Sequence, residues 1–325
     1  MTARGELPAP EHAARPDGEA WLRHMRSGAW ADAWAVSDAV LLARGGATSA
    51  HLQRHEQWVW DGTPLHGRRV LVRCYHGLGD TLQFARFVPP LRAAAAEVTL
   101  WAQPALLPLL ATMRGVGPLE PLNDGAFHGE YDVDVEVMEL GHAARVTPAT
   151  LPPPPHFDVA PAALPRDRRL AVGVVWECGA WDRATRSIPL PLLAPLAAVP
   201  DVVLHLLQRG DALAARDPTF GLVSGHDDVL EAARVVRALD LVITVDSMPA
   251  HLAGVLGVPV WTLLPHADDW RWMDDLDSSP WYPTMRLFRQ PRPGAWQPVV
   301  ERVAGELAAL AAGHRSNVSP QLPRR

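Results

Sequence analysis

The chain has 325 residues, of which 48% are hydrophobic, and a formal net charge of −6. This length exceeds what one hydrophobic core usually organises, so we expect two domains. The negative charge argues against a broad nucleic-acid-binding face. No apolar run reaches the roughly 18 residues of a membrane span, and two cysteines, Cys74 and Cys178, are too few for a disulfide scaffold and are expected in the core.

The N-terminal part is expected to be a tail followed by one helical hairpin. Residues 1–18 are rich in proline, alanine and charge and predict a flexible tail. Residues 19–56 contain two helical patterns that break near Ser27 and Gly28, with tryptophans along their apolar faces. Because a single degenerate, repeat-like hairpin cannot bury its own apolar stripe, we expect it to pack on the body of the protein or on a partner.

Strands and helices then alternate over residues 57–150 and predict a first Rossmann-like α/β domain. The rhythm is that of βαβ units, in which buried apolar runs form parallel strands and amphipathic runs form the connecting helices. The expected strands are 69–74, 98–101 and 131–137, and the expected helices are 80–96 and 104–113.

The proline-rich segment 151–167 can form neither a helix nor a central strand and is predicted to be a linker. The alternation restarts over residues 168–312 and predicts a second doubly wound domain, with a cleft between the carboxyl ends of both sheets. The tryptophan-rich stretch after Pro265 is expected to be irregular, and residues 313–325 are expected to be a tail. The expected strands are 170–176, 202–207, 241–245 and 258–263, and the expected helices are 190–198, 228–239, 248–256 and 296–312.

The first candidate site is the stretch GLGDT, residues 77–81, between the first expected strand and helix. We expect Gly77 and Gly79 to shape a tight turn, and Asp80 or Thr81 can cap the helix. The alternative to a catalytic carboxylate is therefore an ordinary N-cap aspartate. A Walker A loop is excluded because the chain has no lysine, and the dinucleotide fingerprint is excluded because its third glycine is missing.

A second stretch, DSMPAHLAG, begins at Asp246 and also joins a strand to a helix. Free N–H groups and the positive end of the helix dipole there suit a diphosphate, with Ser247, Met248 and Ala250 as donors. The alternative is capping by the aspartate or the serine, with His251 as a buried core histidine.

Two arginines, Arg183 and Arg186, lie in the loop after the first strand of the second domain. A guanidinium at this carboxyl end of the sheet could neutralise a leaving diphosphate, and the alternative is a solvated loop charge.

Two further patterns are less specific. Asp132 and Asp134 resemble a metal-holding D-x-D, but alternate positions of a strand are more typical of a solvated face. Trp270 and Trp272 could stack on carbohydrate or only anchor a long loop on the core.

Four stretches resemble bacterial glycosyltransferases of family 9, the heptosyltransferase-like group with the GT-B fold. More closely, they resemble the C-terminal domain of bacterial tetratricopeptide-repeat proteins that carry such a module. Those proteins have several helical repeats, whereas one hairpin is found here, so a repeat-containing partner is expected. The stretches are WDGTPLHGRRVLVRCYHGLGDTLQFARFVPPL, VGVVWECGAWDRATRSIPL, LDLVITVDSMPAHLAGVLGVPVWTLLP and DWRWMDDLDSSPWYPTMRLFRQ.

The resemblance assigns roles to individual residues. It implies that Asp80 is the catalytic base and that Arg186 pairs with the donor phosphates. The acidic element of the family falls on Leu78, Gly79, Asp80 and Pro89, and its donor element falls on Asp246, Ser247, His251 and Pro259, with Gly254 in place of an alanine. The expected donor-binding residues are Trp176, Arg186, Asp246, Ser247, Met248 and His251, and the expected acceptor-side or turn-shaping residues are Gly77, Gly79, Thr81 and Gln83.

The resemblance also implies a function. We expect a GT-B-like protein whose first domain lies on the acceptor side and whose second domain binds a nucleotide-diphosphate sugar. It would transfer the sugar, with inversion and without a metal or other cofactor, to a hydroxyl of a glycan or protein acceptor. A cytoplasmic location is expected, with peripheral attachment to the inner membrane left open. The alternatives are a non-catalytic binding module of the same fold and a nucleotide-sugar epimerase.

Overall fold

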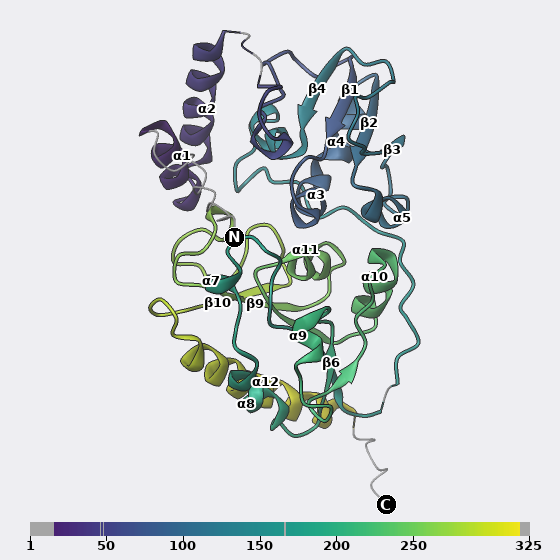
Figure 1. Ribbon diagram of the computed structural model, residues 1–325, viewed down its shortest axis with the longest axis vertical. Coiled ribbons are helices and arrows are strands. Elements are labelled where there is room, and N and C mark those ends of the chain that lie inside the picture. Colours follow the sequence, from purple (N-terminus) through teal and green to yellow (C-terminus); the bar gives the residue numbers. More distant parts are fainter. Residues whose placement is uncertain (1–15, 46, 48, 166, 319–325) are drawn as a thin grey trace, which may run out of the picture.

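The computed structural model describes residues 16–318 except residues 46, 48 and 166. Residues 1–15 of the predicted N-terminal tail therefore lie outside the described residues. The predicted hairpin is present as α1 (Pro16–Arg26) and α2 (Trp30–Arg44), which stand beside the first sheet at one edge of the molecule (Figure 1). The turn between them uses Gly28 at a φ of 80°, a left-handed conformation that favours glycine.

The first domain contains a four-stranded parallel sheet in the order β3-β2-β1-β4. The first helix expected in this domain, 80–96, begins earlier, at Leu78, and is interrupted. The interruption has a local cause: Pro89 and Pro90 carry no N–H to continue the helical hydrogen bonds and instead occupy the start of a new helix. The elements are η2 (Arg54–Glu56), β1 (Arg69–Arg73), α3 (Leu78–Phe84), η3 (Ala85–Phe87), α4 (Val88–Ala94), β2 (Glu97–Ala102), η4 (Pro104–Leu106), α5 (Leu107–Leu110), β3 (Leu119–Pro121), β4 (Val133–Glu136), η5 (Val137–Glu139) and α6 (Leu140–Ala143).

The second domain contains a six-stranded parallel sheet in the order β10-β9-β8-β5-β6-β7. The buried strands β5, β8 and β9 are apolar apart from Thr244 and Thr262, as is typical of a parallel sheet that is buried on both faces. The elements are β5 (Leu170–Val175), α7 (Arg183–Arg186), η6 (Leu190–Leu193), α8 (Ala194–Ala197), β6 (Val202–Leu206), α9 (Asp211–Ala214), β7 (Leu222–Val223), α10 (Val229–Arg237), β8 (Leu241–Val245), α11 (Met248–Val255), β9 (Val260–Leu264), η7 (Trp270–Trp272), β10 (Met285–Arg289) and α12 (Trp296–Val318).

Two expectations about the C-terminal part are wrong. The stretch expected to be irregular contains the edge strand β10, whose side chains Leu287 and Phe288 are buried and whose backbone pairs with β9. The last helix continues to Val318, so the residues predicted as a tail are helical up to that point. The predicted domain boundaries themselves stay a prediction, although the two sheets lie on either side of the proline-rich segment.

The hairpin packs on both domains. On the first domain, the Trp34 indole donates to the carbonyl of Val146 at 2.6 Å. On the second, Trp30 stacks on Trp281 with ring centroids 5.1 Å apart, and Arg26 pairs with Asp268 at 3.0 Å. Burying such rings is the largest apolar gain that a single side chain offers. The expectation that the hairpin packs on the body of the protein is confirmed.

Candidate functional site

Asp80 occupies the third position of α3, at the carboxyl end of β1, and its carboxylate accepts the N–H of Gly77 at 2.9 Å. It therefore reaches back to the start of the helix rather than being the N-cap itself, which corrects the N-cap alternative. Gly77 has a φ of −68°, so no left-handed conformation explains the glycine there. A Cβ at this position would instead lie 3.0 Å from the Asp80 carboxylate.

Gly79 explains how the two halves meet. A Cβ on Gly79 would lie 2.7 Å from Cδ2 of His251, closer than real Cβ atoms approach a neighbouring heavy atom. His251 belongs to α11 of the second domain, and α3 and α11 pack side by side across the domain boundary (Figure 1). The glycine therefore permits a close approach of the two domains, and not the turn that its sequence context suggests.

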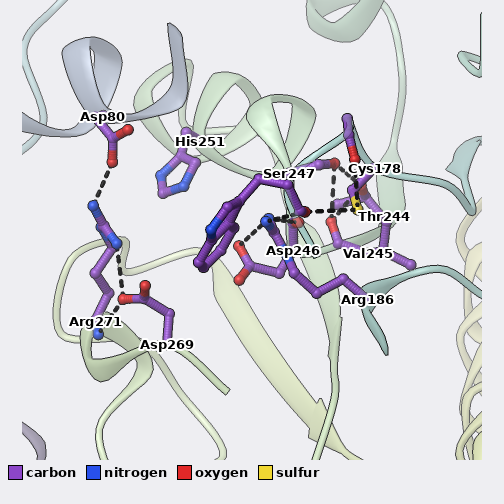
Figure 2. A network of polar contacts seen from close by, with 12 residues as sticks. Asp80, Cys178, Arg186, Thr244, Val245, Asp246, Ser247, His251, Asp269 and Arg271 are labelled. Carbon is purple, nitrogen blue, oxygen red and sulfur yellow. Dashed lines mark hydrogen bonds and ion pairs between the residues drawn. The ribbon is translucent and has the colours of Figure 1, made fainter. Parts of the chain in front are cut away.

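The Asp80 carboxylate also pairs with Arg271 of the second domain, whose guanidinium lies 2.8 Å from Asp269 on its other side (Figure 2). Burial would raise the pKa of Asp80, but the charge of Arg271, followed by those of His251 and His76, outweighs it and lowers that pKa. Asp80 is thus held ionised.

Arg271 was missed by sequence analysis. It lies in η7, in the stretch expected to be irregular, where no periodicity marks which side chains point inward. Burial opposes its charge, yet the carboxylates of Asp269 and Asp80 raise its pKa above the ordinary value. Its Nε has no hydrogen-bond partner among the described residues. A charged residue flanked by tryptophans in a long loop is the one signal that could have singled it out.

His251 is buried, and its Nδ1 lies 3.0 Å from the hydroxyl of Tyr282. Its ring stacks on Trp272 with centroids 5.6 Å apart. Burial lowers the pKa of His251 to about 4, and the charge of Arg271 acts in the same direction. The imidazole is therefore neutral near pH 7 and cannot serve there as a cation for a phosphate.

The donor-side residues gather at the carboxyl end of β8 (Figure 2). Asp246 follows the strand, Ser247 is the N-cap of α11, and Met248 is its first residue. The guanidinium of Arg186 donates to the backbone carbonyl of Asp246 and lies 3.7 Å from its carboxylate. Burial raises the pKa of Asp246, although Arg186 opposes this. Ala250 donates its N–H to the Ser247 carbonyl at 2.9 Å, so it is not free for a phosphate as expected.

Three of the expected site residues are buried, and the roles expected for Thr81 and Gln83 stay predictions. Trp176 is 2% exposed and packs against Phe220 in the core of the second domain, which leaves no ring surface for a donor. The Thr81 hydroxyl is buried and lies 3.1 Å from the side-chain oxygen of Gln103. Gln83 is 0% exposed, and its amide has no partner among the described residues.

The other candidate patterns have structural explanations. Asp132 and Asp134 pair with Arg69 and Arg73 of β1, at 2.8 Å and 2.7 Å. In the part of the chain that the structure describes, no group of three or more metal-ligating side chains is present. Trp272 is fully buried, and Trp270 packs edge-on against Trp21 and Trp281, so both tryptophans anchor the loop. Both cysteines are buried, as expected.

The sequence and the fold of the chain were compared with those of known proteins. No family model matches the chain. Protein FlbA of Caulobacter vibrioides is 27% identical over 290 residues, which is 78% of this chain but 48% of that protein, so the chain spans about half the length of the curated relative it matches. No helix among residues 16–318, leaving out the three undescribed positions, is long and apolar enough to cross a membrane.

Three solved structures share the architecture. A family 9 glycosyl transferase from Veillonella parvula matches with a TM-score of 0.58 at 13% identity, over 79% of this chain and 99% of the other. The ADP-heptose LPS heptosyltransferase II of E. coli matches with a TM-score of 0.53 at 16% identity, over 75% and 99%. E. coli heptosyltransferase WaaC with ADP-2-deoxy-2-fluoro heptose matches with a TM-score of 0.51 at 14% identity, over 73% and 99%. The chain therefore has the GT-B-like fold of the family 9 glycosyltransferases.

Proposed function

We propose that this chain is an inverting, metal-independent glycosyltransferase that moves a sugar from a nucleotide-diphosphate donor to an acceptor hydroxyl. The observation that carries the proposal is the contact of Gly79 with His251, which sets the Asp80 turn of the first sheet against the turn of Asp246 and Ser247 in the second. An inverting transfer needs a base on the acceptor and charge stabilisation of the leaving group, on opposite faces of the anomeric carbon.

In the proposed step, Asp80 takes the proton of the acceptor hydroxyl while that oxygen bonds to the anomeric carbon. The bond from this carbon to the diphosphate oxygen breaks, and the diphosphate leaves with the electron pair. Arg186 and the N–H groups of Ser247 and Met248, at the start of α11, stabilise the developing charge. Asp246 binds sugar hydroxyls, and neutral His251 orients the turn that contains them.

The donor is expected among ADP-linked sugars, because ADP-heptose compounds are named with two of the solved structures of this fold. The acceptor class, a repeat-containing partner and attachment to the inner membrane stay predictions. A non-catalytic binding module is the second candidate. One observation favours it: Asp80 is already paired with Arg271, which lowers the pKa of Asp80 and weakens it as a base.

The test exposes the purified protein to a panel of nucleotide sugars and records thermal stability and nucleotide release. A donor at about 100 times its dissociation constant should stabilise the fold by about 2.7 kcal/mol. Asp80→Asn should lower turnover by at least about 100-fold, the usual contribution of a general base. Because that change also breaks the ion pair with Arg271, the matched control is Arg271→Gln, which breaks the same pair and keeps the carboxylate.

We expect Arg271→Gln to keep turnover within about tenfold of the wild type, since it raises the pKa of Asp80 toward the value of a useful base. An equal loss in both variants would mean that the ion pair is structural and that Asp80 is not the base. Donor binding without nucleotide release, with any acceptor tried, would favour the binding module. Release without transfer to a separate acceptor would point to a reaction within the donor, as in an epimerase.

A further inference from the structure

A cavity of about 940 Å³ lies between the N-terminal hairpin and the first domain, and it also touches the second domain. Its lining residues come from helices α1 and α2, from η5 and from the segment 55–60, among others. This volume is in the range of small-molecule pockets, which are walled mainly by apolar and aromatic side chains. Partly exposed rings in its lining belong to Trp21, Trp58 and Trp270, whereas the lining residues Trp34, Trp60 and Trp281 are buried.

Asp80 is not among the lining residues, but two lining residues at one end of the cavity, His76 and Met138, connect the cavity to it. His76, in the turn before α3, lines the cavity, and its Nδ1 is 2.9 Å from the carboxylate of Glu136. Burial opposes protonation of His76, but Glu136 and then Asp80 outweigh it and raise the pKa of the imidazole. Met138 also lines the cavity, and its sulfur lies 3.8 Å from the Arg271 nitrogen that pairs with Asp80.

The charges around the cavity do not suit an anion. Among its described lining residues, the carboxyl groups belong to Glu56, Glu136 and Glu139, whereas Arg44 is the one guanidinium. The His76 imidazole, whose pKa is raised, already pairs with Glu136. Arg44 already donates to a backbone carbonyl at residue 60, and its guanidinium lies 5.6 Å from the ring centre of Trp58. An anionic ligand would leave water without gaining a free cation, and burial of an unpaired charge is costly.

We propose that this cavity is the acceptor pocket of the transferase proposed above and that it takes an uncharged small acceptor. The aromatic or apolar body of the acceptor stacks on the partly exposed rings of Trp21, Trp58 and Trp270. Its hydroxyl points past His76 toward Asp80, which receives the proton in the transfer step. The hairpin contributes no reacting group to the proposed step. It instead supplies part of the lining of the substrate site, which selects against phosphorylated or carboxylated acceptors.

The test measures binding of a matched pair of probes by equilibrium dialysis, without any donor. Naphthalene-2-methanol is an uncharged aromatic alcohol, and 2-naphthoate has the same ring system with a carboxylate. The variant Ser37→Phe places a larger side chain in the cavity, because Ser37 is a partly exposed residue of α2 that lines it. Its control is Leu42→Phe, on the same helix, because Leu42 is 83% exposed and lies outside the lining.

We expect the wild type to bind the alcohol at least about tenfold more tightly than the carboxylate, a difference of about 1.4 kcal/mol. Ser37→Phe should lower binding of the alcohol by about tenfold or more, and Leu42→Phe should leave it unchanged. A second variant, Trp58→Ala, removes one stacking wall and should also weaken binding of the alcohol. No binding by the wild type, equal binding of both probes, or an unaffected Ser37→Phe would overturn the proposal.

These binding measurements need no turnover, so the pocket proposal can fail while the proposed function stands, and the reverse. If the alcohol binds as expected but no acceptor tried leads to nucleotide release from a donor that binds, the transferase proposal fails, and the pocket stands as a site for uncharged aromatics. If donors are turned over with other acceptors while the cavity binds neither probe, the transferase stands and the acceptor pocket lies elsewhere.

Discussion

Replacing Gly79 by alanine tests the contact that joins the two domains. The added Cβ would lie 2.7 Å from Cδ2 of His251. This ring cannot move away cheaply, because its Nδ1 lies 3.0 Å from the Tyr282 hydroxyl and its face stacks on Trp272. Helices α3 and α11 must therefore separate, and overpacking of this kind typically costs about 1–3 kcal/mol.

The cost is partly offset, because alanine is favoured over glycine within a helix by about 1 kcal/mol. Gly305 in α12 supplies the matched control, since it is exposed, has no left-handed φ, and a Cβ there would meet no atom within 4 Å. Gly305→Ala should stabilise the protein, whereas Gly79→Ala should be neutral or destabilising by up to about 2 kcal/mol. The difference between the two variants, about 1–3 kcal/mol, isolates the clash.

Urea unfolding of the wild type and both variants measures this difference, with equal slopes required for the comparison. A third variant, His251→Ala, removes the ring that the new methyl group would meet. In that background Gly79→Ala should lose its penalty, and the resulting coupling energy measures the contact between the domains. If Gly79→Ala stabilised the wild type as much as Gly305→Ala does, the close approach of the domains would be refuted.

Three further predictions follow from the charges of the site. Arg271→Gln should raise the pKa of Asp80 and move the acidic limb of the pH profile of kcat/KM to higher pH, and an unmoved limb would contradict the ion pair. Arg186→Ala should lower donor affinity and kcat by at least about tenfold each, whereas Arg183→Ala should change neither, because Arg183 is exposed and pairs with another loop residue. Burial raises the pKa of Glu139 to about 7, above its unfolded value of about 4.3. Between these two pH values the folded protein keeps a proton that the unfolded chain has lost, so the stability of the wild type falls as the pH rises from about 4.3 to 7. Glu139→Gln lacks this loss and should therefore compare more favourably with the wild type at pH 8 than at pH 4 in urea unfolding, and the opposite trend would rule out the raised pKa.

The predicted parts of the fold are those with a local cause. Strands β1, β5 and β8 are short and mostly apolar, and each is followed by turn residues. The two turns that follow β1 and β8 contain residues whose spacing resembles a known family. The interruption of the helix after Phe84 also has a local cause in the paired prolines, although the sequence analysis did not use it.

The parts that were missed depend on contacts between distant residues. Arg271 lies next to Asp80 only because η7 folds back over the domain boundary, and no local pattern encodes that path. Gly79 was interpreted as a turn residue, whereas its partner is 172 positions away at His251. The resemblance implies a donor-binding role for Trp176, but its ring packs in the core of the second domain, and only the packing of distant elements decides which face of the sheet a ring joins.

The residues that build the candidate site also hold the two domains together, and this affects how any loss of activity is interpreted. Asp80 and Arg271 join the first domain to the second, and the buried Arg86 does so again, donating from the first domain to the carbonyl of Trp281 at 2.6 Å. Removing one partner of a buried ion pair typically costs about 3–5 kcal/mol, enough to change the domain contact itself. A substitution at Asp80 alone therefore cannot separate lost chemistry from a lost interface. Only the comparison with Arg271→Gln, which disturbs the same interface and spares the carboxylate, makes the role of the base measurable.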